Sequence, residues 1–221
     1  MDESCEFHTK SAYVYVKRGF DIVVSTLLLI LTAPIMALTA IAIRLTMGSP
    51  VLFRQTRAGY KAKPFVILKF RTMLHPTTRD GHRLSEAERI TPLGRFLRKT
   101  SIDELPQLWN VLRGDMSLVG PRPLYVSYLE YYTPREHRRH EVRPGITGLA
   151  QVSGRNYLTW DERLEMDVQY VERMSFWLDL KILARTVFKV LSGRDITVVP
   201  GEVRMLLSDE RARCRETEVS E

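Results

Sequence analysis

Residues 22–43 read IVVSTLLLILTAPIMALTAIAI, a run of 22 residues without a charged side chain. As a helix, such a run is about as long as the hydrocarbon core of a bilayer is thick, roughly 30 Å. A secretory signal peptide is the first alternative, but its apolar region spans only about 7 to 15 residues. No small-residue cleavage site ends the run before Arg44. The run therefore predicts a segment that enters a membrane.

Two features of this run favour a re-entrant helix over a spanning one. Pro34 lies near its middle, where the proline ring and the missing N–H disturb a helix, and Thr32 can bond a carbonyl group freed there. Both flanks are basic, with Lys17 and Arg18 before the run and Arg44 after it. Because cytoplasmic flanks carry the excess of Lys and Arg, both ends are expected in the cytoplasm. A plain spanning helix stays the alternative, since proline also occurs in helices that cross membranes.

The composition of the 221-residue chain favours anionic partners. It has 33 Lys and Arg against 26 Asp and Glu, a formal net charge of +7. Charge alone does not choose among nucleic acid, anionic lipid and phosphorylated substrates. Cys5 and Cys214 form neither a CxxC pair nor a zinc-binding pattern, so no disulfide framework is expected, although a pairing between them stays open. The length allows one soluble domain plus a membrane segment.

The remainder of the chain predicts short strands and several helices. VLFRQ (51–55) and FVILKFRTM (65–73) are expected as neighbouring strands around a turn. Thr91 and Pro92 suit the first positions of a helix, and a second helix within 101–114 is expected to end at Gly114. Helices are also expected over 161–174 and 176–193, the latter amphipathic and suited to a membrane surface or an ordinary protein surface. Expected irregular parts are a surface loop over 75–89, a glycine-rich segment over 142–156 in which only LAQVSG is strand-like, and a disordered or loosely docked tail after Gly193.

Asp103 and Glu104 are adjacent acids at the predicted start of a helix. Adjacent helical residues project in different directions, so the two carboxylates can serve different partners. The positive end of a helix favours an ionised Asp103, which is then available as a nucleophile. The structural alternative is a capping box, in which Ser101 and Glu104 merely complete the first helical turn.

Several cationic side chains at rigid or loop-rich positions are candidates for binding phosphate groups. Each of them is also an acceptable surface charge, and the two that lie beside prolines, Arg122 and Arg143, stand out. His137 and His140 in EHRRHEV fit a solvated basic turn better than a metal site. No Walker A, GxGxxG, GxSxG or HExxH motif occurs in the sequence. The cationic candidates are Lys69, Arg71, Arg98, Lys99, Arg122, Arg143 and Arg155.

Six sequence blocks together resemble the small monotopic phosphoglycosyl transferases, which start bacterial glycan assembly on polyprenyl phosphate. The blocks are KRGFDI, FRQTRAG, LKFRTM, TSIDELPQLWNVLRGDMSLVGPRPL, VRPGITGLAQVSGRN and DLKILARTV, spread over residues 17–195. The resemblance implies a mixed α/β, mostly helical protein with a catalytic domain on the cytoplasmic face of the bacterial inner membrane. The implied parts are an N-terminal tail (1–16), a re-entrant membrane helix-break-helix (17–48), a catalytic domain with short strands and interfacial amphipathic helices (49–195), and a C-terminal tail (196–221). The family's break motif, often Ser-Pro, reads Ala33-Pro34 here.

The resemblance also implies a reaction. Asp103 matches the nucleophile that attacks the sugar-linked phosphorus of a UDP-sugar and releases UMP, after which polyprenyl phosphate takes up the phosphosugar in a ping-pong sequence. Glu104 matches the partner acid expected to bind Mg²⁺. The expected donor carries an N-acetylated or diacetamido hexose. Membrane lipid is a further implied partner, nucleic acid is not expected, and downstream glycosyltransferases or a second copy of the chain stay open. The implied contacts of phosphate or nucleotide are Lys69, Arg98, Arg122, Arg143, Gln151 and Arg155.

One alternative belongs to another class of protein. A non-catalytic, single-pass membrane protein with a basic cytoplasmic domain would bind nucleic acid or anionic lipid. Binding of nucleic acid would need aromatic side chains interleaved with basic ones for stacking on bases. Only FRQTRAGYK (53–61) offers such a pattern.

Overall fold

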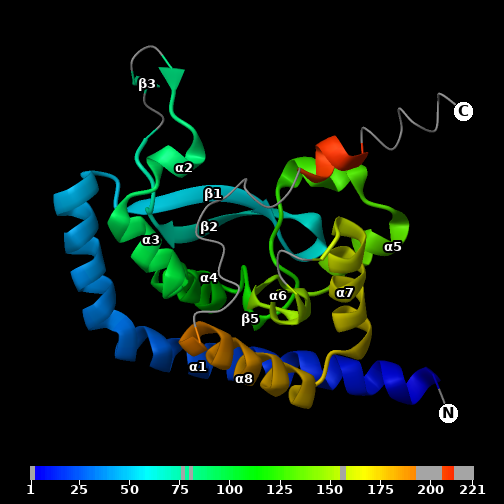
Figure 1. Cartoon of the computed structure of the whole chain (residues 1–221). Helices are drawn as coiled ribbons and strands as arrows, with labels where there is room; N and C mark the ends of the chain where they lie inside the picture. Colours follow the sequence, from blue (N-terminus) through cyan, green and yellow to red (C-terminus); the bar gives the residue numbers. More distant parts are fainter. Residues whose placement is uncertain (1–2, 76–77, 80–81, 155–157, 193–205, 212–221) are drawn as a thin grey trace, which may run out of the picture.

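The computed structural model describes residues 3–75, 78–79, 82–154, 158–192 and 206–211. This part of the chain is a mixed α/β structure that is mostly helical, as the sequence predicts. Figure 1 shows an antiparallel hairpin of β1 (Leu52–Ala58) and β2 (Pro64–Phe70) across the middle of the view, α4 (Gln107–Arg113) beneath it and α1 (Glu3–Met47) below. The hairpin confirms the two strands expected around a turn, which here is the short helical turn η1 (Tyr60–Ala62).

The apolar run lies in α1, which is continuous but bends along its length (Figure 1). Pro34 lies inside this helix, and its missing N–H is a sufficient cause for bending. The expected break is therefore a bend and not an interruption. Thr32 donates to the carbonyl oxygen of Leu28 at 2.6 Å. Within the described residues, only Tyr13–Met47 is a helix long and apolar enough to cross a bilayer, with a mean hydropathy of 2.4.

Polar contacts attach α1 to the remainder of the protein on both sides of the apolar run. Near its start, Lys17 forms an ion pair with Asp179, and Arg18 donates to the carbonyl oxygens of Val111 and Leu112 at 2.6 and 2.8 Å. At its end, Arg71 donates to the carbonyl oxygens of residues 47, 48 and 49, the last two at 2.9 Å. Arg71 is 5% exposed, so it serves as a buried cap for the C-terminus of α1.

Two short helices lead from the hairpin to the region of the acid pair. In α3 (Pro92–Lys99), Thr91 accepts a hydrogen bond from the Gly94 backbone at 2.9 Å, which confirms the predicted helix start. Gly94 touches the backbone of Thr72 so closely that a Cβ atom there would lie 1.9 Å from the Thr72 carbonyl oxygen. The following α4 ends at Gly114, whose φ of 88° is left-handed, as predicted for a helix stop.

Two expectations for the irregular segments are wrong. Segment 75–89 contains β3 (Thr78–Arg79), β4 (His82–Arg83) and α2 (Glu86–Arg89), which starts with a Ser85–Glu88 capping box. In the glycine-rich segment the strand is β6 (Gly145–Thr147), which runs parallel to β5 (Ser117–Val119). LAQVSG forms α6 (Leu149–Ser153) instead, because helical geometry buries Ala150 and Val152 against its neighbours, and packing overrides strand propensity.

The C-terminal half of the body consists of α5 (Pro134–His137), η4 (Arg138–Glu141), α7 (Trp160–Arg173) and α8 (Phe176–Ser192). Residues 206–211 dock on it, with Leu207 fully buried in a cluster with Tyr128 and Trp160. Arg211 pairs with Glu136 at 2.7 Å. These six residues are therefore packed, because the segment contains an apolar side chain and a cation that match the surface of α5 and α7.

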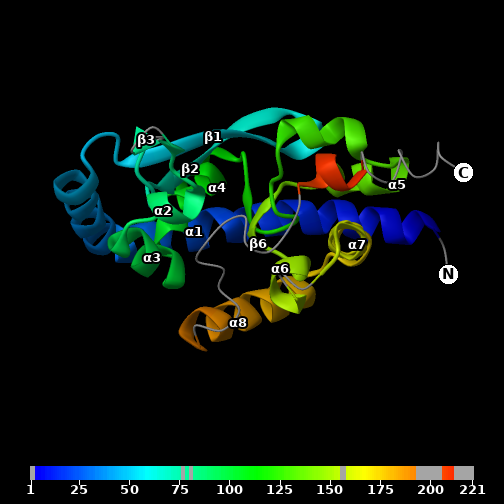
Figure 2. The ribbon, with the colours of Figure 1, turned by 45° about the horizontal axis from the view of Figure 1, so that its top comes forward.

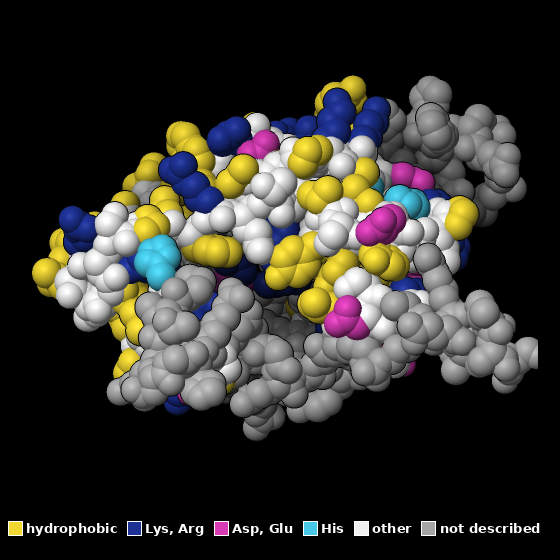
Figure 3. Space-filling model, turned by 90° about the horizontal axis from the view of Figure 1, so that it is seen from above, with side chains coloured by type: hydrophobic (Ala, Val, Ile, Leu, Met, Phe, Trp, Pro, Cys, Tyr) yellow, Lys and Arg dark blue, Asp and Glu magenta, His cyan; other side chains and the backbone are white. Residues whose placement is uncertain are grey.

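The start of α8 contacts α1, where the rings of Phe20 and Phe176 meet at 6.0 Å, and the remainder of α8 is set apart from α1 (Figure 2). Large apolar side chains of α8 face outward, with Trp177 75% and Phe188 69% exposed. In α1, Leu31 and Leu38 are similarly exposed. From the hairpin side, Figure 3 shows Lys and Arg side chains scattered over the visible surface. The exposed apolar residues of both helices fit contact with lipid.

Candidate active site

Asp103 and Glu104 lie in η2 (Ile102–Glu104), a short helical turn between α3 and α4. Ser101 before it has a left-handed φ of 57°, and its side chain makes no capping hydrogen bond. The capping-box alternative is therefore wrong. The acids also do not occupy the start of α4, which begins at Gln107, so the helix dipole is not what determines the charge of Asp103.

Two cationic partners, which come from distant positions in the chain, stabilise the ionised form of Glu104. Its Oε1 atom lies 2.6 Å from Nζ of Lys69 on β2 and 3.2 Å from Nη2 of Arg122. Burial alone would raise the pKa of Glu104, but the charges and hydrogen bonds of Lys69 and Arg122 lower it to about 2. Glu104 thus carries its negative charge throughout the neutral range.

Asp103 has the opposite perturbation. Its side chain is buried, with 8% of the residue exposed. Burial is the main cause that raises the pKa of Asp103 to about 6, and the adjacent charge of Glu104 is the second, while Lys69, Arg98 and Arg122 oppose the rise. Two neighbouring acids whose pKa values are driven apart are typical of sites where one group reacts and the other supports it.

Arg98 reaches this site from the last turn of α3. Its Nε atom donates to the hydroxyl oxygen of Thr72 at 3.0 Å. The close approach of Gly94 to Thr72 brings α3 onto the segment that follows β2. Arg98 is thereby near enough for its positive charge to act on Asp103. Three of the predicted phosphate-binding cations therefore meet the two predicted acids.

The irregular segment that follows β5 and carries Arg122, here called the Arg122 loop, contacts a buried ion pair. Nη2 of Arg139 donates to the Arg122 carbonyl oxygen at 2.6 Å and to Asp167 on α7 at 2.7 Å. The side chains of Arg139 and Asp167 are 1% and 3% exposed. The solvated turn expected for EHRRHEV is wrong at Arg139 and at His140, which is 6% exposed. Sequence analysis missed Arg139 and Asp167, because two charges that neutralise each other in the core look like surface charges in a sequence.

Other predicted site residues make their contacts away from the acid pair. Nε of Arg143 donates to the Gly114 carbonyl oxygen at 2.9 Å, at the far end of α4. Nε2 of Gln151 donates to the Ile146 carbonyl oxygen at 2.9 Å. Arg155 lies outside the described residues. The predicted substrate contacts of these three residues stay predictions, whereas Arg71 is engaged at the end of α1.

The residues that offer oxygen ligands for a hard cation here are Asp103 and Glu104. No group of three or more His, Cys, Asp and Glu gathers within the described ranges. Mg²⁺ commonly takes one or two carboxylates together with water and substrate phosphates, so this donor pair fits it in kind. Because Glu104 is paired with Lys69 and Arg122, it would have to exchange at least one of these contacts to bind a cation.

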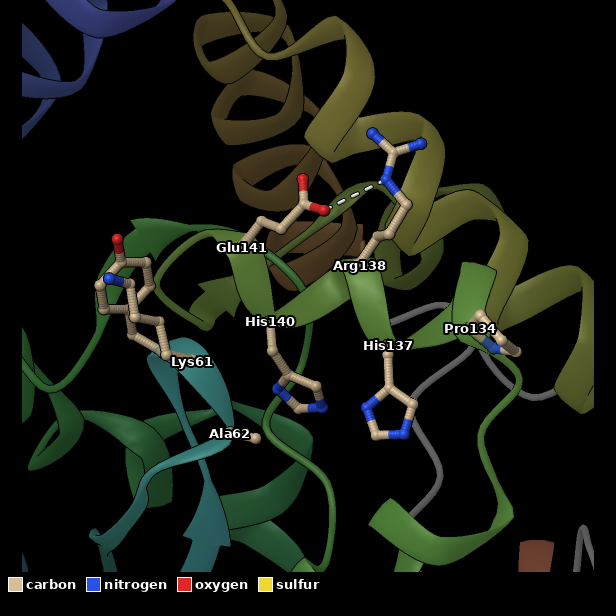
Figure 4. A pocket seen from close by; sticks show the side chains of 8 residues that line it. Lys61, Ala62, Pro134, His137, Arg138, His140 and Glu141 are labelled. Carbon is tan, nitrogen blue, oxygen red and sulfur yellow. Dashed lines mark hydrogen bonds and ion pairs between the residues drawn. The ribbon is translucent and has the colours of Figure 1, made fainter.

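A hollow of about 550 Å³ lies elsewhere, at the tip of the hairpin (Figure 4). It is lined by η1, α5 and η4, and none of the predicted site residues lines it. Nδ1 of His140 lies 3.1 Å from the Gly59 carbonyl oxygen, and burial lowers the pKa of His140 to about 4. A neutral, buried histidine in this packing is a structural residue, so the acid pair remains the candidate active site.

Comparison with known proteins identifies the family of this chain. The sequence model of bacterial sugar transferases matches residues 12–193, which include the apolar run, the acid pair and the cations around it. The chain belongs to the bacterial sugar transferase family. This membership favours a transferase over the alternative of a non-catalytic basic membrane protein.

Similar proteins include transferases that differ in the sugar named. The chain is 53% identical over 180 residues to an uncharacterized sugar transferase of Bacillus subtilis, covering 81% of this chain and 89% of that protein. It is 47% identical over 188 residues to a UDP-glucose:undecaprenyl-phosphate glucose-1-phosphate transferase of Caulobacter vibrioides, covering 80% and 70%. An N-acetylgalactosaminephosphotransferase of Aeromonas hydrophila, which acts on undecaprenyl phosphate, is 39% identical over 189 residues, covering 82% of this chain and 45% of that protein.

Proposed function

We propose that this protein transfers a sugar phosphate from a UDP-sugar to polyprenyl phosphate at the cytoplasmic face of the bacterial inner membrane. The observation that carries the proposal is a buried Asp103 with a pKa near neutrality, surrounded by Lys69, Arg98 and Arg122 and supported by an ionised Glu104. The names of the Caulobacter and Aeromonas relatives describe reactions of this class.

In the first half-reaction, a carboxylate oxygen of Asp103 attacks the sugar-linked phosphorus of the donor. A bond forms between this oxygen and phosphorus, the bridging P–O bond breaks, and its electron pair leaves with UMP. In the second half-reaction, a phosphate oxygen of polyprenyl phosphate attacks the same phosphorus. The Asp103–phosphorus bond breaks, so the carboxylate is regenerated and a polyprenyl diphosphate sugar is released.

The three cations around the acid pair match the charge of a diphosphate. Lys69 and Arg122 both reach Glu104, so they are positioned to bind donor phosphate oxygens when the donor arrives. Arg98 contributes a third positive charge next to Asp103. We propose that Mg²⁺ is held by Glu104 together with the donor phosphates, where it would neutralise charge that develops on the leaving UMP.

The attachment of α1 supports a re-entrant position in the membrane. Lys17 and Arg18 lie before the apolar run and Met47 lies after it, yet all three bind the same charged body. A helix that crossed the bilayer would separate these two attachments by about 30 Å of hydrocarbon. A charged domain could not contact both ends of the helix, because its charged side chains would have to enter the hydrocarbon. Both ends of α1 are therefore proposed to lie on the cytoplasmic side, so that Asp103 lies close to the lipid surface.

The donor sugar is a finer proposal. We retain the predicted N-acetylated or diacetamido hexose as the first donor to test, but glucose and N-acetylgalactosamine both occur in the names of relatives. Loops around a shared site set such choices. A panel of UDP-sugars with and without an acetamido group therefore belongs in the functional test.

The test measures UMP release by detergent-solubilised protein for each donor, with and without polyprenyl phosphate. At least one donor should give continuous, lipid-dependent release, and without lipid it should give a single burst and a phosphosugar adduct detectable by intact mass. Asp103→Asn should abolish release and adduct, whereas Asp115→Asn, which changes an acid beside Arg113 at the end of α4, should retain both. Absence of lipid-dependent UMP with every donor, or an adduct that persists in Asp103→Asn, would contradict the proposal.

A further inference from the structure

Arg57 is a half-buried cation near the candidate active site that the proposed reaction does not yet use. It lies near the end of β1, opposite Phe65 on β2. The guanidinium carbon is 3.7 Å from the ring centroid of Tyr125, and Nη2 donates to Oε1 of Gln55 at 2.6 Å. Stacking on the ring and this hydrogen bond hold the planar guanidinium group in one orientation.

No carboxylate of the described chain neutralises Arg57. Its contacts are with the Gln55 amide and the Tyr125 ring, both of which are uncharged. Burial lowers the pKa of Arg57 most. Tyr125 opposes this effect, and the nearby positive charge of Arg122 lowers the pKa further. Keeping a desolvated cation next to a second cation is costly unless an anion joins them. The arrangement is therefore complementary to an anionic ligand.

The position of Arg57 connects it to the donor site. The Ala58 backbone N–H donates to the Leu124 carbonyl oxygen at 3.0 Å, which ties the end of β1 to the Arg122 loop. Arg122 interacts with Glu104 through its side chain and is also the cation whose charge reaches Arg57. Arg122 thus interacts with the acid pair and also acts electrostatically on Arg57, so a ligand whose phosphorus lies at Asp103 can extend toward Arg57.

Given the proposed function, we infer that Arg57 binds a phosphate oxygen of the nucleotide half of the UDP-sugar, with Tyr125 holding its guanidinium group in place. A guanidinium group presents paired N–H donors that match a phosphate, so the contact would favour nucleotides over nucleosides. Arg57 is then a donor-binding residue beyond those that the sequence analysis identified.

The test compares inhibition of UMP release by UMP and by uridine, in wild type and in Arg57→Met. The inhibition constant of UMP should rise about 10- to 100-fold in Arg57→Met, because a charge-assisted hydrogen bond is lost, while that of uridine stays unchanged. Arg57→Lys keeps the charge but loses the fork geometry, so it should give a smaller rise. Arg54→Met, on the same strand and exposed, is the matched control and should behave as wild type.

Either of two results would overturn the inference. One is an inhibition constant of UMP that is unchanged in Arg57→Met. The other is a rise of the constants of UMP and uridine by the same factor, which would indicate a structural role. If Arg57→Met does not fold, the ratio of the two constants in Arg57→Lys decides between the same outcomes. Lipid-dependent turnover by wild type tests the proposed function separately. Should wild type show no turnover, calorimetric binding of UMP and uridine to wild type and Arg57→Met still tests the phosphate contact.

Discussion

At the level of single residues, Asp103 and Glu104 differ because their surroundings differ. Glu104 meets Lys69 and Arg122 directly, so opposite charge dominates and the pKa falls to about 2. In Asp103, burial and the charge of Glu104 prevail, and the pKa rises to about 6. A carboxylate with a raised pKa is a better nucleophile than an ordinary one and is still largely ionised at pH 7.

These values predict the pH dependence of the first half-reaction. Only ionised Asp103 attacks, so the rate should be constant above the pKa and should fall about tenfold per pH unit below about pH 6. The pKa of Glu104 is about 2 and that of His140 is about 4, so neither group changes its charge near pH 6.

The measurement is the single burst of UMP released without lipid, followed between about pH 4.5 and 8. Omitting polyprenyl phosphate matters, because its own phosphate titrates near neutral pH. A burst rate that stays constant down to about pH 5 would show that Asp103 is not the titrating nucleophile.

At the level of elements, the buried pair of Arg139 in η4 and Asp167 in α7 supports the Arg122 loop. The pair unites these two elements. Arg139 also donates to the Tyr132 hydroxyl oxygen at 3.4 Å and to the Arg122 carbonyl oxygen at 2.6 Å. Removing one member of a buried pair leaves an uncompensated charge, which typically costs about 3–5 kcal/mol of stability, whereas replacing both by apolar side chains is often neutral.

Arg139→Met is therefore expected to lower the free energy of unfolding by about 3–5 kcal/mol, and adding Asp167→Leu should restore most of it. The double variant still lacks the hydrogen bond to Arg122, so its kcat/KM should stay below wild type. Unfolding midpoints and donor kinetics of the single and double variants test this. Wild-type kinetics in a stable double variant would show that the contact does not position Arg122.

At the level of the whole molecule, α1 and the body form one unit with the membrane segment between two attachments. Before the apolar run, Lys17 and Arg18 of α1 contact the body. After the run, Arg71 of the body caps the end of α1. Ile43 near the end of α1 is fully buried against Phe70 and Leu97, which strengthens the second attachment.

This arrangement predicts that single cysteines at Tyr15 and Leu45, which are 77% and 81% exposed, face the same side of the membrane. The native Cys5 and Cys214 are first replaced by Ser. In intact cells, a membrane-impermeant thiol reagent should then label neither introduced cysteine, and both should react after the membrane is permeabilised. The same pair of positions in a Pro34→Ala background tests the bend, because a straighter helix should send part of the population across. Labelling of one position from outside in the parent protein would restore the spanning helix.

The local parts of this protein follow from the sequence alone. The apolar run, the hairpin around RAGYKAKP, the start of α3 at Thr91 and the stop of α4 at Gly114 were all predicted, because each depends on residues a few positions apart. The acid pair was also identified, but the predicted reason for its charge was wrong.

Tertiary structure decided the environment of the charged residues. Glu104 meets Lys69, 35 positions away, and Arg139 meets Asp167, 28 positions away. The same holds for the burial that raises the pKa of Asp103. It also holds for the surroundings of Arg57, where no carboxylate of the described residues forms an ion pair with the guanidinium group. The physical reason is that burial and long-range charge contacts exist only once distant segments pack together, whereas caps, turns and apolar length act between neighbours in the chain.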